Sequence, residues 1–143
     1  MKLTLLILTI LICAMPVAAQ EAKAWDAKNI VWQNEDSDGT KYALLEGERN
    51  VPGKAFTYAF FIPAGYWEHH WHSADARVAV ISGALSISFG EKLDKERAKS
   101  YPVGSYLLVP ANVKHTMGAT VDTIIIGTAI GPWATHRHED HKH

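Results

Sequence analysis

The chain has 143 residues, with 14 basic and 15 acidic side chains and a formal net charge of −1. This near-neutral balance, without a basic cluster, argues against nucleic acid as a partner. Cys13 is the single cysteine, so the chain can form no internal disulfide. An apolar core must therefore supply the stability of the fold.

The first 19 residues have the pattern of a secretory signal peptide. Lys2 gives a positive start, residues 3–14 are mostly apolar, and residues 17–19 are small, as a cleavage site requires. The apolar run is shorter than the roughly 20 residues that span a bilayer. We expect cleavage near Ala19, loss of Cys13 with the leader, and a periplasmic or secreted product without a membrane segment.

From residue 20 on, short aromatic or β-branched runs alternate with Gly, Pro and polar turns. Pro132 ends the last run, because proline cannot join a central ladder. The charged interval 91–99 is typical of a solvated loop or a single helical turn, with a lid over a pocket as the alternative. The pattern predicts an all-β sandwich or barrel in one domain, residues 20–134, with strands near 42–45, 56–62, 78–81, 84–89, 105–109 and 123–130.

Two histidines at strand spacing are the strongest chemical signal. His70 and His72 are two residues apart, and side chains at i and i+2 of a strand point to the same face. His69 and Trp71 then fall on the opposite face. A lone histidine is more often structural than a ligand, but two at this spacing can reach one ion, and neutral imidazole is the commonest metal ligand. A third histidine, His115, follows a proline-initiated turn.

These segments resemble the two sequence motifs of the cupin superfamily. Gly83, Gly104 and Pro110 stand at the motif positions, and Gly65 lies within one residue of its place. About two thirds of the chain, residues 42–133, is similar to small single-domain cupins of the type-2 or ChrR-like kind, which close with Gly-Pro-Trp.

The resemblance implies a fold, a metal site and an assembly. The fold is the cupin jelly-roll, a β-sandwich or barrel. The ligands of a divalent metal are His70, His72 and His115, which enter one barrel in such proteins. The family also suggests a homodimer, an expectation that rests on analogy.

The chain departs from the motif at Ala76, where the family has a glutamate ligand. Three interpretations follow, in order of preference. The site uses three histidines alone; or Glu68, on the same face as His70, supplies the missing oxygen; or the metal site is degenerate and the barrel binds a ligand. Arg77 should face away from the interior unless a bulge shifts the register. Asn112, in place of a motif glycine, is a smaller change because Asn tolerates the left-handed backbone.

The identity of the ion stays open among zinc, iron and manganese. Three neutral imidazoles leave both charges of a divalent ion uncompensated, which favours anionic or chelating oxygen ligands. Zinc would lower the pKa of bound water, and iron(II) would have vacant positions for O₂ and a substrate. The partner we expect is therefore a small molecule.

A general base is harder to identify. Glu68 is the candidate catalytic residue if it is not a ligand. Tyr58 or Tyr106 could face the cavity, although either could equally pack with its hydroxyl at the rim. Met117 would line the same cavity or fill the core.

Residues 135–143 form a histidine-rich tail that could scavenge metal, or could be a solvated terminus that touches metals weakly. Three functions remain. The first is an exported metal-binding cupin that acts as a small-molecule oxygenase or isomerase. The second is a non-catalytic barrel that binds a ligand or sequesters metal. The third is a partner-binding role through the face of Trp67 and Trp71.

Overall fold

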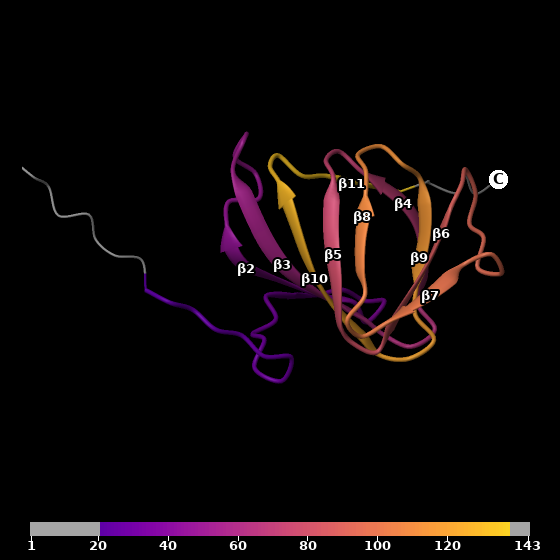
Figure 1. Ribbon diagram of the computed structural model, residues 1–143, viewed down its shortest axis with the longest axis horizontal. Coiled ribbons are helices and arrows are strands. Elements are labelled where there is room, and N and C mark those ends of the chain that lie inside the picture. Colours follow the sequence, from indigo (N-terminus) through magenta and orange to yellow (C-terminus); the bar gives the residue numbers. More distant parts are fainter. Residues whose placement is uncertain (1–20, 138–143) are drawn as a thin grey trace, which may run out of the picture.

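Aromatic and β-branched runs separated by glycine turns give a protein built of strands. The computed structural model describes residues 21–137, which contain eleven β-strands and no α-helix. In this range there is consequently no helix with the length and apolarity to cross a membrane. The strands form two antiparallel sheets that face each other around the interior (Figure 1). The predicted leader, residues 1–19, lies outside the described residues.

The larger sheet has six strands in the order β1-β2-β3-β10-β5-β8. Its central ladder joins β3 and β10, which pair over eight residues in continuous register. The strands are β1 (Asn34–Glu35), β2 (Lys41–Gly47), β3 (Ala55–Ile62), β5 (Ala76–Ser82), β8 (Tyr106–Val109) and β10 (Thr123–Ile130).

The smaller sheet has five strands in the order β11-β4-β9-β6-β7. It contains both segments that carry the predicted ligands. The strands are β4 (Trp67–His72), β6 (Ala84–Phe89), β7 (Lys99–Pro102), β9 (His115–Gly118) and β11 (Thr135–Arg137).

The pairing is that of one long hairpin wrapped into a barrel. β6 pairs with β7, β5 with β8, β4 with β9 and β3 with β10. Successive pairs alternate between the two sheets, which is the jelly-roll arrangement that the sequence predicts. Gly83 connects β5 to β6 at a φ of 71°, and a Cβ there would clash with the backbone of Asp122 and Thr123. Only glycine makes this turn between sheets without strain.

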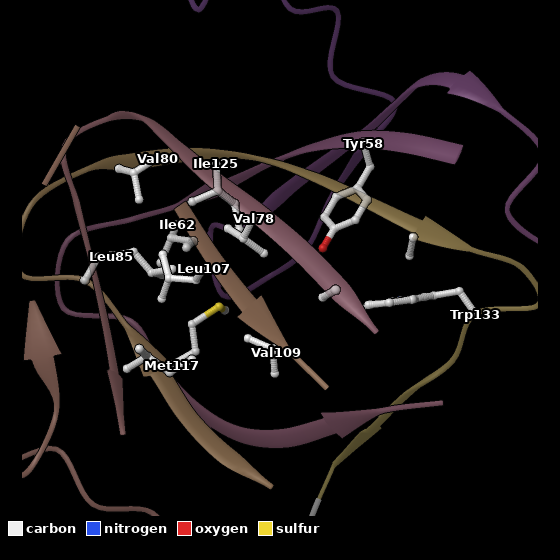
Figure 2. Packing of buried hydrophobic residues seen from close by; sticks show 14 of the residues in the cluster. Tyr58, Ile62, Val78, Val80, Leu85, Leu107, Val109, Met117, Ile125 and Trp133 are labelled. Atoms are coloured by element: carbon white, nitrogen blue, oxygen red, sulfur yellow. The ribbon is translucent and has the colours of Figure 1, made fainter. Parts of the chain in front are cut away.

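The core lies between the two sheets and mixes aliphatic with aromatic side chains (Figure 2). Ile62 of β3 and Val80 of β5 are almost completely buried. Tyr58 and Trp133 face each other on one side of the core, with ring centroids 6.1 Å apart. The apolar part of the interior thus passes directly into an aromatic wall.

Most predicted strands are confirmed, and the differences have physical reasons. Strand β7 lies at the end of the charged interval, and its Pro102 is tolerated because β7 is an edge strand. The domain predicted to end at residue 134 continues, because β11 pairs with β4. The first three residues of the predicted tail therefore belong to the fold. Residues 138–143 lie outside the described residues.

Candidate metal centre

The three predicted ligands come from two paired strands. His70 and His72 are in β4 and share a face, as the alternation of side chains predicts. His115 begins β9 and lies directly opposite His70 in the β4–β9 ladder. The turn before β9 is fixed by Asn112, whose φ is 62° and whose backbone N–H donates to the carbonyl of His72 over 2.8 Å. This hydrogen bond ties the second motif to the first.

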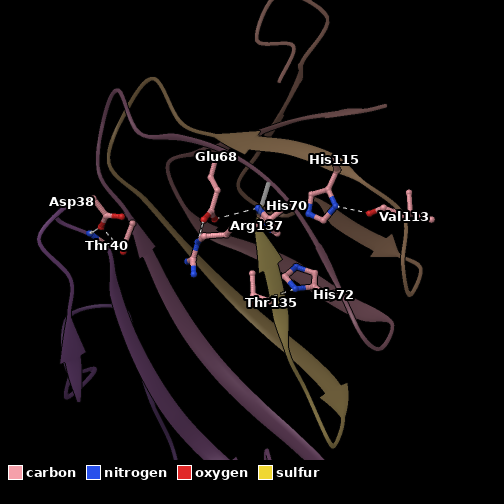
Figure 3. Close-up of polar contacts among 9 residues, drawn as sticks. All are labelled: Asp38, Thr40, Glu68, His70, His72, Val113, His115, Thr135 and Arg137. Atoms are coloured by element: carbon pink, nitrogen blue, oxygen red, sulfur yellow. Dashed lines mark hydrogen bonds and ion pairs between the residues drawn. The ribbon is translucent and has the colours of Figure 1, made fainter. Parts of the chain in front are cut away.

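The imidazoles converge inside the barrel (Figure 3). The ring centroid of His70 is 4.7 Å from that of His72 and 4.3 Å from that of His115. The candidate ligand atoms of the three all lie within 4.8 Å of one another. Two nitrogens bonded to one ion at about 2.1 Å can be at most about 4.2 Å apart. Small ring movements therefore separate this arrangement from a coordination sphere.

Each ring has an oxygen near its Nδ1. His115 Nδ1 is 2.9 Å from the carbonyl oxygen of Val113, and His72 Nδ1 is 3.3 Å from the hydroxyl of Thr135. His70 Nδ1 is 3.2 Å from Oε2 of Glu68, close enough for an ion pair, and makes no regular hydrogen bond. Ligand histidines are commonly held through their second nitrogen in this way. The three Nε2 atoms remain for an ion, and the donor set fits a divalent metal.

Burial keeps the rings in the form that binds metals. It lowers the pKa of His72 to about 2, with further lowering by the charges of His70 and His115. Burial likewise lowers the pKa of His115 to about 4, together with the charge of His70. Both rings are therefore neutral at physiological pH, and a neutral imidazole has the free electron pair that a metal needs.

Glu68 is inside the site but is occupied by neighbouring groups. Its carboxylate contacts Nδ1 of His70 on one side and the guanidinium of Arg137, from β11, on the other. Burial opposes the charged form, but the contacts with His70 and Arg137 outweigh it and lower the pKa of Glu68 to about 2. So weak a base is poorly suited to remove a proton from a substrate. Its geometry suits the orientation of His70 better.

Ala76, which replaces the motif glutamate, begins β5 and is 1 % exposed within the core. Its inward orientation agrees with the motif alignment. Arg77 points outward and lies 3.8 Å from Asp75, as the alternation predicts. The position at which the cupin motif has its glutamate is therefore filled by a methyl group that packs with apolar neighbours.

A cavity of about 340 Å³ opens beside the histidines. His72 stacks on Trp133, with ring centroids 4.3 Å apart, so the Gly-Pro-Trp segment forms one wall. Both sheets contribute to the lining, which comprises Asn34, Asp36, Tyr42, Arg49, Tyr58, Phe60, Glu68, His70, His72, Met117, Ile125, Trp133, Thr135 and Arg137. A volume of this size suits a small molecule.

Of the other residues considered from the sequence, two line the cavity and two do not. Tyr58 and Met117 line the cavity and also pack in the core cluster, so the lining alternative holds for both residues, and for Met117 the core alternative holds as well. Tyr106 does not: it is 65 % exposed on the outer face of the edge strand β8, because its neighbour Leu107 takes the inward position. His69 lies on the opposite face from the cluster, with Nε2 2.9 Å from the carbonyl oxygen of Gly90.

The sequence does not reveal nine of the fourteen residues that line the cavity, and four of these nine bear on the chemistry. By sequence, Arg137 falls in the predicted tail, Arg49 in a loop, Tyr42 in a predicted strand and Trp133 in the closing Gly-Pro-Trp segment. The one available signal was the Gly-Pro-Trp motif, which places Trp133 at a fixed distance after the last long strand. The other three depend on which loop or strand the fold brings over the histidines.

Comparison with known proteins finds no matching family model and no matching curated protein. Solved structures do match. A cupin-like protein of Thermotoga maritima is 20 % identical, with 78 % of this chain and 90 % of that chain covered and a TM-score of 0.61. An acetylacetone dioxygenase of Acinetobacter johnsonii is 22 % identical, with coverage of 85 % and 80 % and a TM-score of 0.59. A double-stranded β-helix protein of Klebsiella pneumoniae is 10 % identical, with coverage of 82 % and 99 % and a TM-score of 0.60.

These likenesses establish the class of fold. The chain has the double-stranded β-helix fold of the cupin superfamily, as its two motifs indicated. At these identities the likeness concerns the fold, and the chemistry must be argued from the residues of this chain.

Proposed function

We propose that the protein binds one divalent metal ion through His70, His72 and His115 and acts on a small molecule in the adjoining cavity, as an oxygenase or isomerase. One observation carries the proposal: three imidazoles, each with an oxygen near its Nδ1, converge beside a cavity of about 340 Å³. When bound, the ion would supply Lewis acidity or, as iron(II), O₂ chemistry.

The residues around the cluster suit this role. Glu68, the carbonyl of Val113 and the hydroxyl of Thr135 hold the rings in orientation. Trp133 and Ile125 give the cavity an apolar wall on part of its surface. One acetylacetone dioxygenase shares the fold, which makes chelating diketones a reasonable first class of substrate.

A non-catalytic barrel that binds a ligand or sequesters metal is the second candidate. It is favoured by Ala76 at the fourth ligand position and by Glu68, which is committed to His70 and Arg137. With Glu68 held in this way, we identify no strong general base among the described residues of the cavity.

One experiment separates the two candidates. The full chain is loaded with iron(II) without oxygen, its metal content is measured, and O₂ uptake is followed with a panel of β-diketones. Metal-dependent uptake that is absent in His70→Ala supports the enzyme. Metal and ligand binding without uptake supports the second candidate. A chain that takes up no metal contradicts both.

Export belongs to the proposal as well and rests on the first 19 residues. Expression of the full gene product in a bacterial host should yield a periplasmic protein that has lost a segment ending near Ala19. Intact mass measurement of the periplasmic fraction tests this directly. A full-length cytoplasmic product would contradict it.

A further inference from the structure

Two arginines line the cavity, and only one of them is paired. Arg137 contacts the carboxylate of Glu68. Arg49, in the loop between β2 and β3, is half-buried and forms no ion pair with any carboxylate of residues 21–137. A partly desolvated cation without a counter-ion is costly unless a ligand supplies the negative charge.

The backbone fixes Arg49 at the edge of the cavity. Its carbonyl accepts a hydrogen bond from the N–H of Trp133 over 3.2 Å. A Cβ at Gly131 would lie only 2.6 Å from the same carbonyl oxygen, so glycine is needed for this close approach. The Gly-Pro-Trp segment thus holds both Trp133 and Arg49 against the site.

The guanidinium of Arg49 lies beside a second polar group of the cavity, the hydroxyl-bearing ring of Tyr42. Its central carbon is 5.1 Å from the centroid of the Tyr42 ring. The Tyr42 hydroxyl is buried and interacts with the Arg49 guanidinium, but no acceptor among the described residues takes its proton. Burial raises the pKa of Tyr42, although the nearby charge of Arg49 opposes this, so the hydroxyl keeps its proton. A buried donor without an acceptor costs free energy that a ligand oxygen would recover.

The charges of the cavity favour an anion. The charges of Arg49, Arg137, Glu68 and Asp36 sum to zero, but Asp36 is exposed at the rim and forms no ion pair with Arg49, so the excess arises with the metal. A divalent ion on three neutral imidazoles adds two positive charges without adding a negative one. Arg49, His70 and His72 all line this one cavity, so Arg49 and two of the candidate ligands face the same space.

We propose that Arg49 and the Tyr42 hydroxyl form a subsite for the carboxylate of a small organic acid whose other end faces the three histidines. The inference rests on the proposed function for its metal-facing half and names the substrate class of that site. Arg49 supplies the charged donor, and Tyr42 supplies a neutral donor next to it. The acid is bound by both ends within one cavity.

A matched pair of probes tests the subsite. Acetylpyruvate is a β-diketone with a carboxylate, and its methyl ester keeps the diketone but lacks the charge. Both are titrated calorimetrically into the zinc-loaded full chain, in which no oxidation intervenes. We expect the acid to bind about 10- to 100-fold more tightly than the ester.

Three variants assign the preference to residues. Arg49→Gln should abolish it, and Tyr42→Phe should reduce it about threefold to tenfold, while affinity for the ester stays unchanged in both. Arg77→Gln is the matched control, since it removes an outward-facing arginine paired with Asp75, and it should keep the full preference. Equal affinities of the wild type for the two probes would overturn the subsite, as would a preference that survives Arg49→Gln.

Zinc content, measured before each titration, separates failure of the subsite from failure of the proposed function. If the chain holds zinc but does not bind the acid more tightly than the ester, only the subsite proposal fails. If the chain holds no zinc, the proposed function fails, and the same pair is titrated into the metal-free protein. A preference for the acid there, lost in Arg49→Gln, still supports the subsite, whereas no binding of the acid contradicts it.

Discussion

The β3–β10 pair and the β4–β9 pair are both nested partners of one jelly roll, but their inner faces differ in kind. The β3–β10 pair turns apolar side chains such as Ile62 and Ile125 inward. The β4–β9 pair turns Glu68, His70 and His115 inward, over a ladder half as long. Apolar burial stabilises the first pair without help. The β4–β9 pair buries polar groups that a bound ligand would stabilise. The β3–β10 pair therefore contributes mainly to the stability of the fold, and the β4–β9 pair contributes the side chains of the candidate metal site.

The largest effect on metal binding should come from His115→Ala, which removes one of the three candidate ligands carried by the β4–β9 pair. Zinc retained by the full chain after dialysis should drop by about one equivalent. His69→Ala is the matched control, because His69 is adjacent to His70 but lies on the opposite face of β4. Elemental analysis of both variants measures the difference. Equal zinc in the two would show that His115 is not a ligand.

In the β3–β10 pair, a substitution should lower the stability of the fold but leave zinc binding unchanged. Ile62→Ala deletes a side chain with 0 % exposure from β3 and should lower the free energy of unfolding by about 2–5 kcal/mol. Zinc binding by the folded variant should stay at the wild-type level. Urea denaturation of the metal-free protein gives the first value, and zinc titration gives the second. Loss of zinc from a folded Ile62→Ala protein would mean that the two pairs are not independent.

Glu68→Gln should weaken metal binding at the β4–β9 pair without abolishing it. It removes the charge that contacts His70 and Arg137, and loss of such an outer contact typically costs about 10- to 100-fold in metal affinity. Arg137→Gln should cost less, because Arg137 acts only through Glu68. Competition with a zinc chelator gives the affinities. An unchanged affinity in Glu68→Gln would remove Glu68 from the positioning role.

A further effect, which depends on pH, is expected on the acid stability of the metal-free protein. Burial and neighbouring histidines hold the pKa of His115 at about 4 and that of His72 near 2, both below the value of 6.5 for an exposed histidine. The unfolded chain therefore binds more protons than the folded chain once the pH falls below about 6.5. Stability should be fully present above that pH and decline from about 6.5 toward 4.

Urea midpoints measured across this range test the prediction, and the double variant His72→Gln/His115→Gln should show a shallower decline between pH 6.5 and 4. If the wild type and the double variant declined equally, the two histidines would not be the groups that titrate.

The same two pairs show how far the sequence could predict the structure. Period-two alternation was enough to bring His70 and His72 to one face and His69 to the other, because both pairs obey one rule of strand geometry. The motif spacing brought His115 to them. Asn112 took the left-handed turn expected of it.

The remaining features depend on long-range pairing. Strand β11 has no apolar period, since Thr135, His136 and Arg137 are all polar, and its position is fixed by pairing with β4. The contact of Arg137 with Glu68 could not be predicted without that pairing. Arg49 reached the cavity because the turn after β10 binds its loop through backbone hydrogen bonds, which leave no mark in the sequence pattern.

An anomalous difference map of crystals of the full chain grown with zinc would test the central claim most directly. We predict a single strong peak inside the barrel, about 2.1 Å from the Nε2 atoms of His70, His72 and His115. A barrel without a peak in crystals that hold zinc elsewhere, or a peak bonded to fewer than all three rings, would contradict it.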